Sequence, residues 1–181
     1  MNRHTFILQQ FCLETETVRS CLAITGTVRR RADALLLQYH ISGDIHELHI
    51  PRQNGAVGRR NELWQDSCFE CFIGVKGSGR YWEINLSPNG DWNVYCFSDY
   101  RQGMIEETAF QVLPCTFYET KDDLWLDLIV DLSALIREDH PVELGISCVL
   151  KHHNGETTLW ALCHPGPQAD FHHRSGFIFA M

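Results

Sequence analysis

LWQDSCFECFIGVKGSGRYWEINLSPNGDWNVYCFSDYR, residues 63–101, is the stretch that decides the fold. It contains three runs of strand length, which lie at 68–75, 80–86 and 92–98. A KGSG turn separates the first run from the second, and a PNG turn separates the second from the third. Asn-Gly and Gly-x-Gly between β-rich runs are strong hairpin signals. The stretch therefore predicts a three-stranded meander.

Side chains alternate between the two faces of a strand, so each of the first two runs has an apolar side and a mixed side. The apolar sides, which we expect to face the core, carry Phe69, Cys71, Ile73, Trp82, Ile84 and Leu86. The opposite sides carry Glu70, Tyr81, Glu83 and Asn85. Carboxylates and an amide beside aromatic rings are typical of a binding surface. We expect function on this outer, partly polar face.

Length and charge limit the class of protein. A chain of 181 residues suits one domain with a substantial core, and we expect residues 1–181 to form it. The net charge of −8 argues against nucleic acid and anionic membranes as partners. No apolar run is long enough to span a membrane, and the first residues lack the features of a secretion signal. The sequence therefore predicts a cytoplasmic protein.

Eight cysteines raise the question of disulfides or zinc. Most of them lie in apolar, strand-like runs, where a free cysteine acts as a small buried hydrophobe. The Cys68-x-x-Cys71 pair resembles half a zinc site, but its odd spacing places the two thiols on opposite faces of a strand. We therefore expect all eight cysteines to be reduced.

The rest of the chain adds strand-like runs at 5–11, 21–28, 34–41, 45–50, 110–118, 124–130, 143–150, 157–163 and near Phe177. Arg29-Arg30-Arg31 is expected to form a solvated turn. Asp131 is expected to begin the one short helix, which ends at about Glu138. About a dozen short strands with one short helix indicate an all-β sandwich or barrel.

Several motifs resemble a known family. Trp64, Asp66-Ser67, Glu70 and Phe72 precede a Tyr81-Trp82-Glu83-x-Asn85 strand, and Trp160-x-x-x-His164-Pro165 precedes Asp170-Phe171-His172. This order resembles the DOMON-like domains, which are similar to family 9 carbohydrate-binding modules. The resemblance covers about residues 20–181. It implies a two-sheet antiparallel β-sandwich of jelly-roll-like form.

The resemblance also implies a binding site. Carbohydrate-binding members hold a sugar between two aromatic side chains, beside a glutamate and an asparagine. Trp64 and Phe171 match the two aromatic positions, Glu70 the glutamate and Asn85 the asparagine. Trp160 is the nearby tryptophan of the same late segment, and Tyr81 and Arg101 complete the candidate set. The family's arginine and glutamine contacts fall at Glu83 and Val149 here, so we expect sugar binding in the millimolar range or weaker.

The leading hypothesis is a non-catalytic module for a carbohydrate or similar small ligand, with no cofactor and no metal. A second hypothesis is a glycoside-acting enzyme that uses Glu70 and Glu83, because carboxylates directly opposed on adjacent strands are about 5 Å apart, a separation that suits retaining glycosidases, and their repulsion raises one pKa. A third is a haem-binding relative, since some DOMON domains hold haem through a methionine, and Met104 is the one internal methionine. Arg101 is equally suited to a salt bridge and to a ligand contact.

A metal site is the remaining alternative for the late loop. The histidines and the aspartate that a loop could fold onto one point are His164, Asp170, His172 and His173. Loop histidines are common, so the leading hypothesis assigns them no metal.

Overall fold

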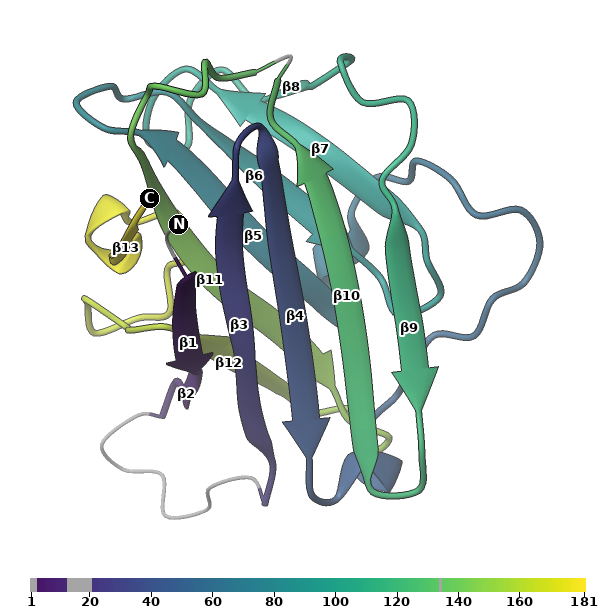
Figure 1. The fold of residues 1–181 in the computed structure, drawn as a ribbon. Helices are drawn as coiled ribbons and strands as arrows, with labels where there is room; N and C mark the ends of the chain where they lie inside the picture. Colours follow the sequence, from purple (N-terminus) through teal and green to yellow (C-terminus); the bar gives the residue numbers. More distant parts are fainter. Residues whose placement is uncertain (1–2, 13–20, 134) are drawn as a thin grey trace.

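The computed structural model describes residues 3–12, 21–133 and 135–181, which form two antiparallel β-sheets packed face to face (Figure 1). The front sheet contains, in spatial order, β1 (Arg3–Ile7), β3 (Ala23–Arg31), β4 (Ala34–Ser42), β10 (Asp123–Asp131) and β9 (Cys115–Glu119). The eight-stranded sheet behind it runs β2 (Gln9–Gln10), β12 (Thr157–Ala161), β11 (Val142–Lys151), β5 (Cys68–Val75), β6 (Tyr81–Leu86), β7 (Trp92–Phe97) and β8 (Ile105–Glu106), with β13 (Phe179–Ala180) paired to β11. The predicted all-β sandwich with two antiparallel sheets is confirmed.

The core lies between the two sheets and follows the predicted alternation. On β5, Phe69, Cys71 and Ile73 are at most 2% exposed and face this core. On the facing sheet, alternate residues of β10 from Leu124 to Val130 are buried in the same way. The predicted meander is therefore confirmed, with its apolar sides directed inward.

The three consecutive arginines extend a strand, so the turn expected there is wrong. Arg29, Arg30 and Arg31 are the last residues of β3 and pair with the start of β4. The guanidinium of Arg30 donates to the carbonyl oxygens of Glu138 at 3.0 Å and His140 at 2.7 Å. These bonds to a distant loop keep the cationic run in extended form.

The strand expected at 45–50 is also wrong. Ile45–Glu47 forms a 3₁₀ helix, η1, in which the N–H of Leu48 donates to the carbonyl of Ile45. Ile45 and Leu48 are both buried. Apolar residues three apart fit a 3₁₀ turn, and the alternating pattern of this short run could not distinguish the two structures.

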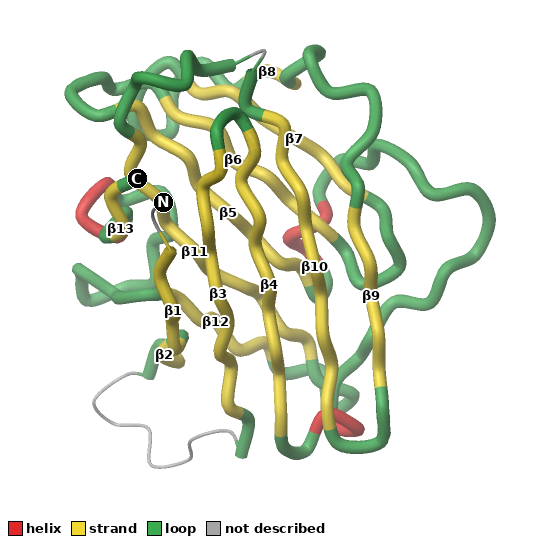
Figure 2. Tube along the Cα trace, in the orientation of Figure 1, coloured by secondary structure: helices red, strands yellow, loops and turns green. Residues whose placement is uncertain are grey.

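The helix expected between Asp131 and Glu138 does not form in the described residues of that segment. Asp131 Oδ1 accepts from the N–H of Ser133 at 2.9 Å, and one turn follows in which Leu132 O accepts from Leu135 and Ile136. Ala134 lies outside the described residues. The helical segments of the described chain are short 3₁₀ turns outside the sheets, namely η1, η2 (Leu63–Gln65) and η3 (Arg174–Gly176) (Figure 2). None of them has the length or the apolar character needed to cross a membrane.

All eight cysteines are free thiols in this structure, and Cys68, Cys71, Cys96 and Cys148 are buried. Cys21, which the sequence placed inside a strand, is exposed and precedes β3. We expect thiol titration of the denatured, unreduced protein to give eight thiols, with the four buried ones unreactive until the protein unfolds. A count of six or fewer would demonstrate a disulfide.

Candidate functional site

A row of four polar side chains crosses the outer face of the eight-stranded sheet. The register pairs Ser147 of β11 with Glu70 of β5, Glu70 with Asn85 of β6, and Asn85 with Asn93 of β7. Each of the four is at most 3% exposed. The predicted shared direction of Glu70 and Asn85 is confirmed. The exposure expected of this face is wrong, because a later part of the chain covers it.

Five aromatic residues lie beside the polar row and form what we call the outer cluster: Phe72, Tyr81, Tyr95, Phe97 and Phe177. The rings of Tyr81 and Phe97 stack with their centroids 4.7 Å apart. Glu83 pairs in register with Phe72 on one side and Tyr95 on the other. The carboxyl group of Glu83 is therefore flanked mainly by aromatic side chains.

Residues 164–177, which we call the covering segment, lie over this face. Its Phe177 packs into the outer cluster above Gly145, where a Cβ atom would lie only 2.8 Å from the ring. Glycine at that position lets the segment approach the sheet closely. Its Arg174 donates to the carboxylate of Glu143 at 2.9 Å. An aromatic anchor and an ion pair thus fix the segment in place.

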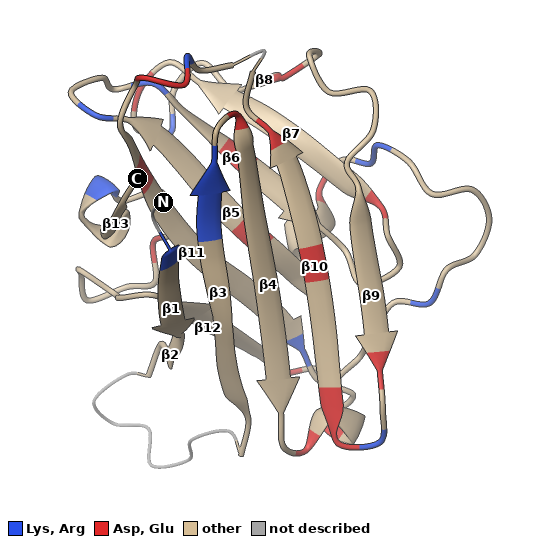
Figure 3. Ribbon diagram, in the orientation of Figure 1, with Lys and Arg blue, Asp and Glu red and all other residues tan. Residues whose placement is uncertain are grey.

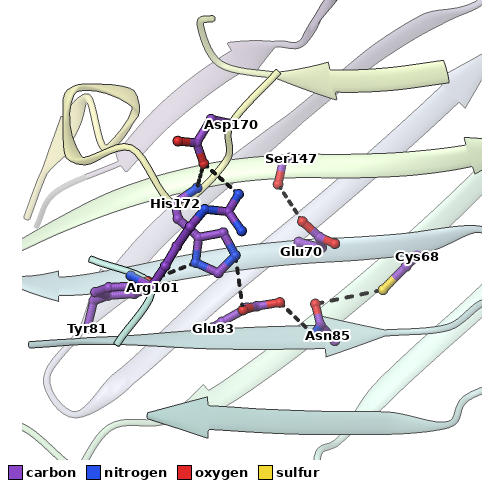
Figure 4. A network of polar contacts seen from close by, with 9 residues as sticks. All are labelled: Cys68, Glu70, Tyr81, Glu83, Asn85, Arg101, Ser147, Asp170 and His172. Carbon is purple, nitrogen blue, oxygen red and sulfur yellow. Dashed lines mark hydrogen bonds and ion pairs between the residues drawn. The ribbon is translucent and has the colours of Figure 1, made fainter. Parts of the chain in front are cut away.

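Each buried glutamate accepts a hydrogen bond from a neutral side chain (Figure 4). Ser147 Oγ donates to Glu70 Oε2 at 3.1 Å, and Asn85 Nδ2 donates to Glu83 Oε1 at 2.8 Å. Glu70 pairs with Asn85 and Glu83 pairs with Phe72, so the glutamates are diagonal neighbours. The hypothesis that Glu70 and Glu83 lie directly opposite each other on neighbouring strands is therefore wrong. Diagonal positions are about 7–8 Å apart, wider than the spacing of opposed residues.

His172 of the covering segment sits between Tyr81 and Glu83. Tyr81 Oη accepts from the N–H of Arg101 at 3.2 Å and lies 2.8 Å from His172 Nδ1. The single phenolic hydrogen can then donate to Nδ1, which places the imidazole proton on Nε2. His172 Nε2 is 3.7 Å from Glu83 Oε2. We assign this tautomer, in which His172 directs its N–H toward the glutamate.

Arg101 and Asp170 link the covering segment to the sheet. Arg101 Nη2 donates to Asp170 Oδ1 at 2.8 Å, and Tyr100 Oη donates to the other carboxylate oxygen. The salt bridge that the sequence allowed for Arg101 is therefore present. Arg101 has a positive φ of 52°, an uncommon conformation for a residue with a side chain. Strained backbone of this kind gathers at functional sites.

Burial and mutual repulsion set the protonation of the glutamates. Burial, followed by the nearby charge of Glu83, raises the pKa of Glu70 to about 8. Burial likewise raises the pKa of Glu83 to about 7, and the Asn85 hydrogen bond and the Arg101 charge oppose that rise. The carboxyl pair titrates as a unit and keeps a proton at neutral pH.

The imidazole of His172 is neutral at physiological pH. Burial and the positive charge of Arg101 lower its pKa to about 4, while Asp170 opposes that shift. Its contact with Glu83 is therefore a weak polar contact between largely uncharged groups, although the geometry alone would suit an ion pair.

The two aromatic residues expected to hold a sugar lie at the rim of the outer cluster. Trp64 and Phe171 are partly buried and pack against that cluster. The indole of Trp64 meets Tyr95 edge to face, with centroids 5.8 Å apart. A platform open on both sides would leave the Trp64 indole largely exposed, whereas here one side of the ring packs against Tyr95 of β7.

Trp160 does not belong to this face. It pairs in register with Cys148 on the core side of the sheet and is 4% exposed within the core. Its indole N–H donates to Thr158 Oγ1 at 2.9 Å. Placing Trp160 in the site is therefore a mistake, and the cause is the alternation along β12, which turns this residue inward.

Sequence reasoning missed Ser147 and Asn93 in the polar row, and it considered Asp170 and His172 only as metal ligands. Ser147 is the one polar residue in the otherwise apolar run GISCVL, and that anomaly was a usable signal. Asn93, which accepts from an Arg59 guanidinium nitrogen, directly faces Asn85 across a hairpin turn. The position of the PNG turn sets the register of the hairpin, so the pairing of Asn85 with Asn93 could have been predicted from the sequence.

Four cavities stand out in the described chain, and neither Glu70 nor Glu83 lines any of them. A small one of about 10 Å³ lies beneath Phe171 and beside Ser147, with room for about one water molecule. No group of three or more His, Cys, Asp and Glu side chains in the described residues is placed to hold a metal ion. Met104, the residue considered for haem, is 47% exposed.

No protein-family model matches the sequence, and a comparison with curated proteins found no match. Among solved structures, the chain is similar to a candidate carbohydrate-binding protein from Bacteroides uniformis ATCC 8492, with a TM-score of 0.70 and 12% identity over 96% of this chain and 83% of that one. It is also similar to a family 9 carbohydrate-binding module from Caldicellulosiruptor kristjanssonii in complex with glucose, with a TM-score of 0.51 and 10% identity over 96% of this chain and 82% of that one. At these identities the likeness shows the fold, which this chain shares with a family 9 carbohydrate-binding module.

Proposed function

We propose that this chain is a non-catalytic module that binds a carbohydrate on the outer face of the eight-stranded sheet. The observation that carries the proposal is the polar row, in which a carboxyl group, two amides and a hydroxyl lie side by side, with the Glu83 carboxyl group and aromatic rings next to it. Carboxyl and amide groups accept and donate to vicinal hydroxyls, while aromatic faces cover the C–H surface of a sugar ring. The glucose complex of the structurally similar module supports this ligand class.

The ligand reaches this face when the tip of the covering segment moves. Glu70 and Glu83 are only 3% and 5% exposed, and His172 of the covering segment lies with its Nε2 3.7 Å from Glu83 Oε2. The Asp170–Arg101 ion pair that holds this tip is half exposed on the arginine side, and such pairs contribute little stability. Opening frees Arg101 for a ligand hydroxyl. It also uncovers the carboxyl pair.

Affinity for a monosaccharide is expected to be weak. Each net hydrogen bond contributes about 0.5–1.5 kcal/mol, and opening the covering segment subtracts from that gain. A millimolar dissociation constant follows for a sugar held by Glu83, Asn85 and Arg101. Tyr81 contributes indirectly, since its hydroxyl fixes both Arg101 and His172.

A hydrolytic role receives less support than binding. A glycosidase surrounds the scissile bond with two accessible carboxyl groups, whereas this pair is buried and lies outside the four cavities. The proposal therefore expects glucose and cellobiose to be recovered intact after prolonged incubation with the protein. Release of glucose from cellobiose would favour the enzyme.

Calorimetric titration with glucose and cellobiose tests the proposal. Asp170→Ala is expected to tighten binding several-fold, because loss of the ion pair to Arg101 favours the open segment. Glu83→Ala in the same background is expected to abolish binding. Asp139→Ala is the matched control, since it removes an exposed aspartate that pairs with Arg137 and leaves the site intact.

Two results would contradict the proposal. The first is the absence of binding to either sugar, by the natural protein and by Asp170→Ala alike. The second is binding that survives Glu83→Ala unchanged.

We further propose that residues 1–181 act as one DOMON-like domain in the cytoplasm, without nucleic acid or a membrane as partner. The eight free thiols support a reducing compartment, and the net charge of −8 disfavours polyanionic partners. Fractionation of the native cells should place the protein with cytoplasmic markers. Its recovery outside the cytoplasmic membrane would contradict this assignment.

A further inference from the structure

Three arginines lie side by side on the outward face of the five-stranded sheet, and we call them the arginine patch. Arg3 of β1 pairs in register with Arg29 of β3, and Arg31 lies two residues further along the same face of β3. Val28, next to Arg29 in the chain, is buried in the core, so the patch points away from the core. In Figure 3 the end of β3 and the start of β1 are blue.

The arginines of the patch differ from the others because they lack acidic partners. Arg30 and Arg59 donate to backbone carbonyl oxygens. The remaining arginines of the described chain form ion pairs with carboxylates, namely Arg52, Arg60, Arg80, Arg101, Arg137 and Arg174. Arg3, Arg29 and Arg31 have neither kind of partner within the described residues. The chain has 23 acidic and only 15 basic residues, so a shortage of carboxylates is not the reason.

Arg29 provides a second, independent indication of an anionic ligand. Its Nε is the one buried side-chain nitrogen or oxygen of the described chain that has no hydrogen-bond partner. Burial of an unpaired polar group costs free energy, and like charges directly opposed on neighbouring strands repel each other. An anion bound between Arg3 and Arg29 would reduce both costs, because it would accept from the guanidinium groups and neutralise their charge.

Two carboxylates lie near the patch without neutralising it. Asp33 is in the turn between β3 and β4, and Asp131 is separated from Arg31 by Ala34 of β4 in the register of the sheet. Two strand spacings amount to about 10 Å. Asp131 accepts from the N–H of Ser133. Neither carboxylate forms an ion pair within the described residues, so the guanidinium groups of the patch are left for a ligand.

Apolar side chains continue the row beyond Arg29. Leu36 of β4 pairs in register with Arg29, and Ile129 of β10 pairs with Leu36. Ile129 is 47% exposed. The row therefore changes from cationic to apolar over about 10 Å, which suits a small ligand with an anionic end and an apolar body.

We propose that the arginine patch binds the phosphate group of a small, soluble phosphomonoester whose apolar body packs on Leu36 and Ile129. Such a phosphate carries a charge of about −1.5 to −2 at neutral pH and has three acceptor oxygens. The planar fork of each guanidinium matches these oxygens, whereas a carboxylate offers one charge and two oxygens. The net charge of −8 disfavours polyanions and anionic membranes, so the ligand is a single small anion. The patch lies on the sheet opposite the outer cluster, and the inference is independent of the proposed sugar site.

Calorimetric titration with phenyl phosphate, inorganic phosphate and benzoate at low ionic strength tests the proposal. Phenyl phosphate is expected to bind saturably at about millimolar concentration or below, and the other two anions several-fold more weakly. Arg29→Gln should weaken phenyl phosphate binding about tenfold or more. Arg52→Gln is the matched control, because it removes an equal charge from an exposed ion pair of another part of the chain and should leave binding unchanged. Ile129→Ala should reduce the advantage of phenyl phosphate over inorganic phosphate.

Further measurements separate this site from other roles of the same residues. Arg29→Gln should unfold at the same urea concentration as the natural protein or a higher one, because it removes the repulsion of Arg3. Arg31→Gln, at an exposed position, should also weaken phenyl phosphate binding several-fold. Glu83→Ala should keep phenyl phosphate binding and lose glucose binding. Vesicles of phosphatidylcholine with phosphatidic acid, a phosphomonoester lipid, should not sediment the protein.

Four results would overturn the inference. They are the absence of phenyl phosphate binding, binding that is unchanged in both Arg29→Gln and Arg31→Gln, an equal loss of binding in Arg52→Gln, and sedimentation with phosphatidic acid vesicles. The third would reduce the effect to the overall charge of the protein. The fourth would make the patch a membrane contact.

Discussion

Between about pH 6.5 and about pH 8, the free energy of unfolding is expected to fall by about 2 kcal/mol because of the carboxyl pair alone. The folded-state pKa of Glu70 is raised to about 8 and that of Glu83 to about 7. An unfolded glutamate has already lost its proton in this range, so the folded state holds more protons than the unfolded state. Stability therefore decreases as pH rises through the two folded-state values.

The lower limit of this range is set by His172. Its folded-state pKa is lowered to about 4, so the unfolded state holds more protons between that value and the ordinary histidine pKa. Stability from His172 therefore rises with pH over the acidic range and opposes the two glutamates there. At about pH 6.5 half of the unfolded histidine still holds its proton, so the His172 contribution is complete only near about pH 7.5 and offsets about 0.4 kcal/mol of the decline caused by the glutamates.

Urea unfolding at a series of pH values measures this slope. Glu70→Gln is expected to remove most of it and to be more stable than the natural protein at pH 8, because the neutral amide has no proton to lose. Glu138→Gln, at an exposed position, is the matched control and should keep the natural slope. An unchanged slope in Glu70→Gln would show that Glu70 is ionised in the folded protein.

Trp160→Ala is expected to lower the free energy of unfolding by about 3–5 kcal/mol, as truncation of a buried tryptophan does. The side chain is 4% exposed within the core, and its truncation would leave a cavity there. The Thr158 hydroxyl would also lose the indole N–H that it accepts. Urea unfolding at fixed pH gives the difference from the natural protein.

Trp125→Ala is the comparison for this measurement, since it removes the same side chain from the outward face of the five-stranded sheet. Its loss of stability should be clearly smaller. If Trp160→Ala instead unfolds with the natural midpoint, Trp160 does not belong to the core, and its place in a ligand site must be reconsidered.

Local patterns were sufficient to predict the central meander and the direction of its side chains. The two glycine-containing turns defined the strands, and alternation then placed Ile73 inward and Glu70 outward, as found. The burial of Glu70 could not be predicted in this way. It results from the covering segment, which lies about a hundred residues later in the chain and packs through Phe177.

The errors have related causes. Trp160 was assigned to the binding site because of the family resemblance, whereas the pairing of β12 with β11 turns its side chain toward the core. The arginine run at 29–31 had the composition of a turn, but bonds from Arg30 to a distant loop keep it extended. In each case a contact remote in sequence outweighed the local preference.

Nitrogen-15-labelled protein titrated with glucose and followed by amide chemical shifts tests the central claim most directly, because it reports both binding and its location. The account predicts saturable shifts at Glu83, Asn85, Arg101 and residues 170–172, at millimolar glucose and larger in amplitude for Asp170→Ala at equal concentration. The amides around Trp125 should stay unmoved by this small sugar. Shifts confined to other parts of the chain, or none at all in either protein, would contradict a carbohydrate site on the outer face of the eight-stranded sheet.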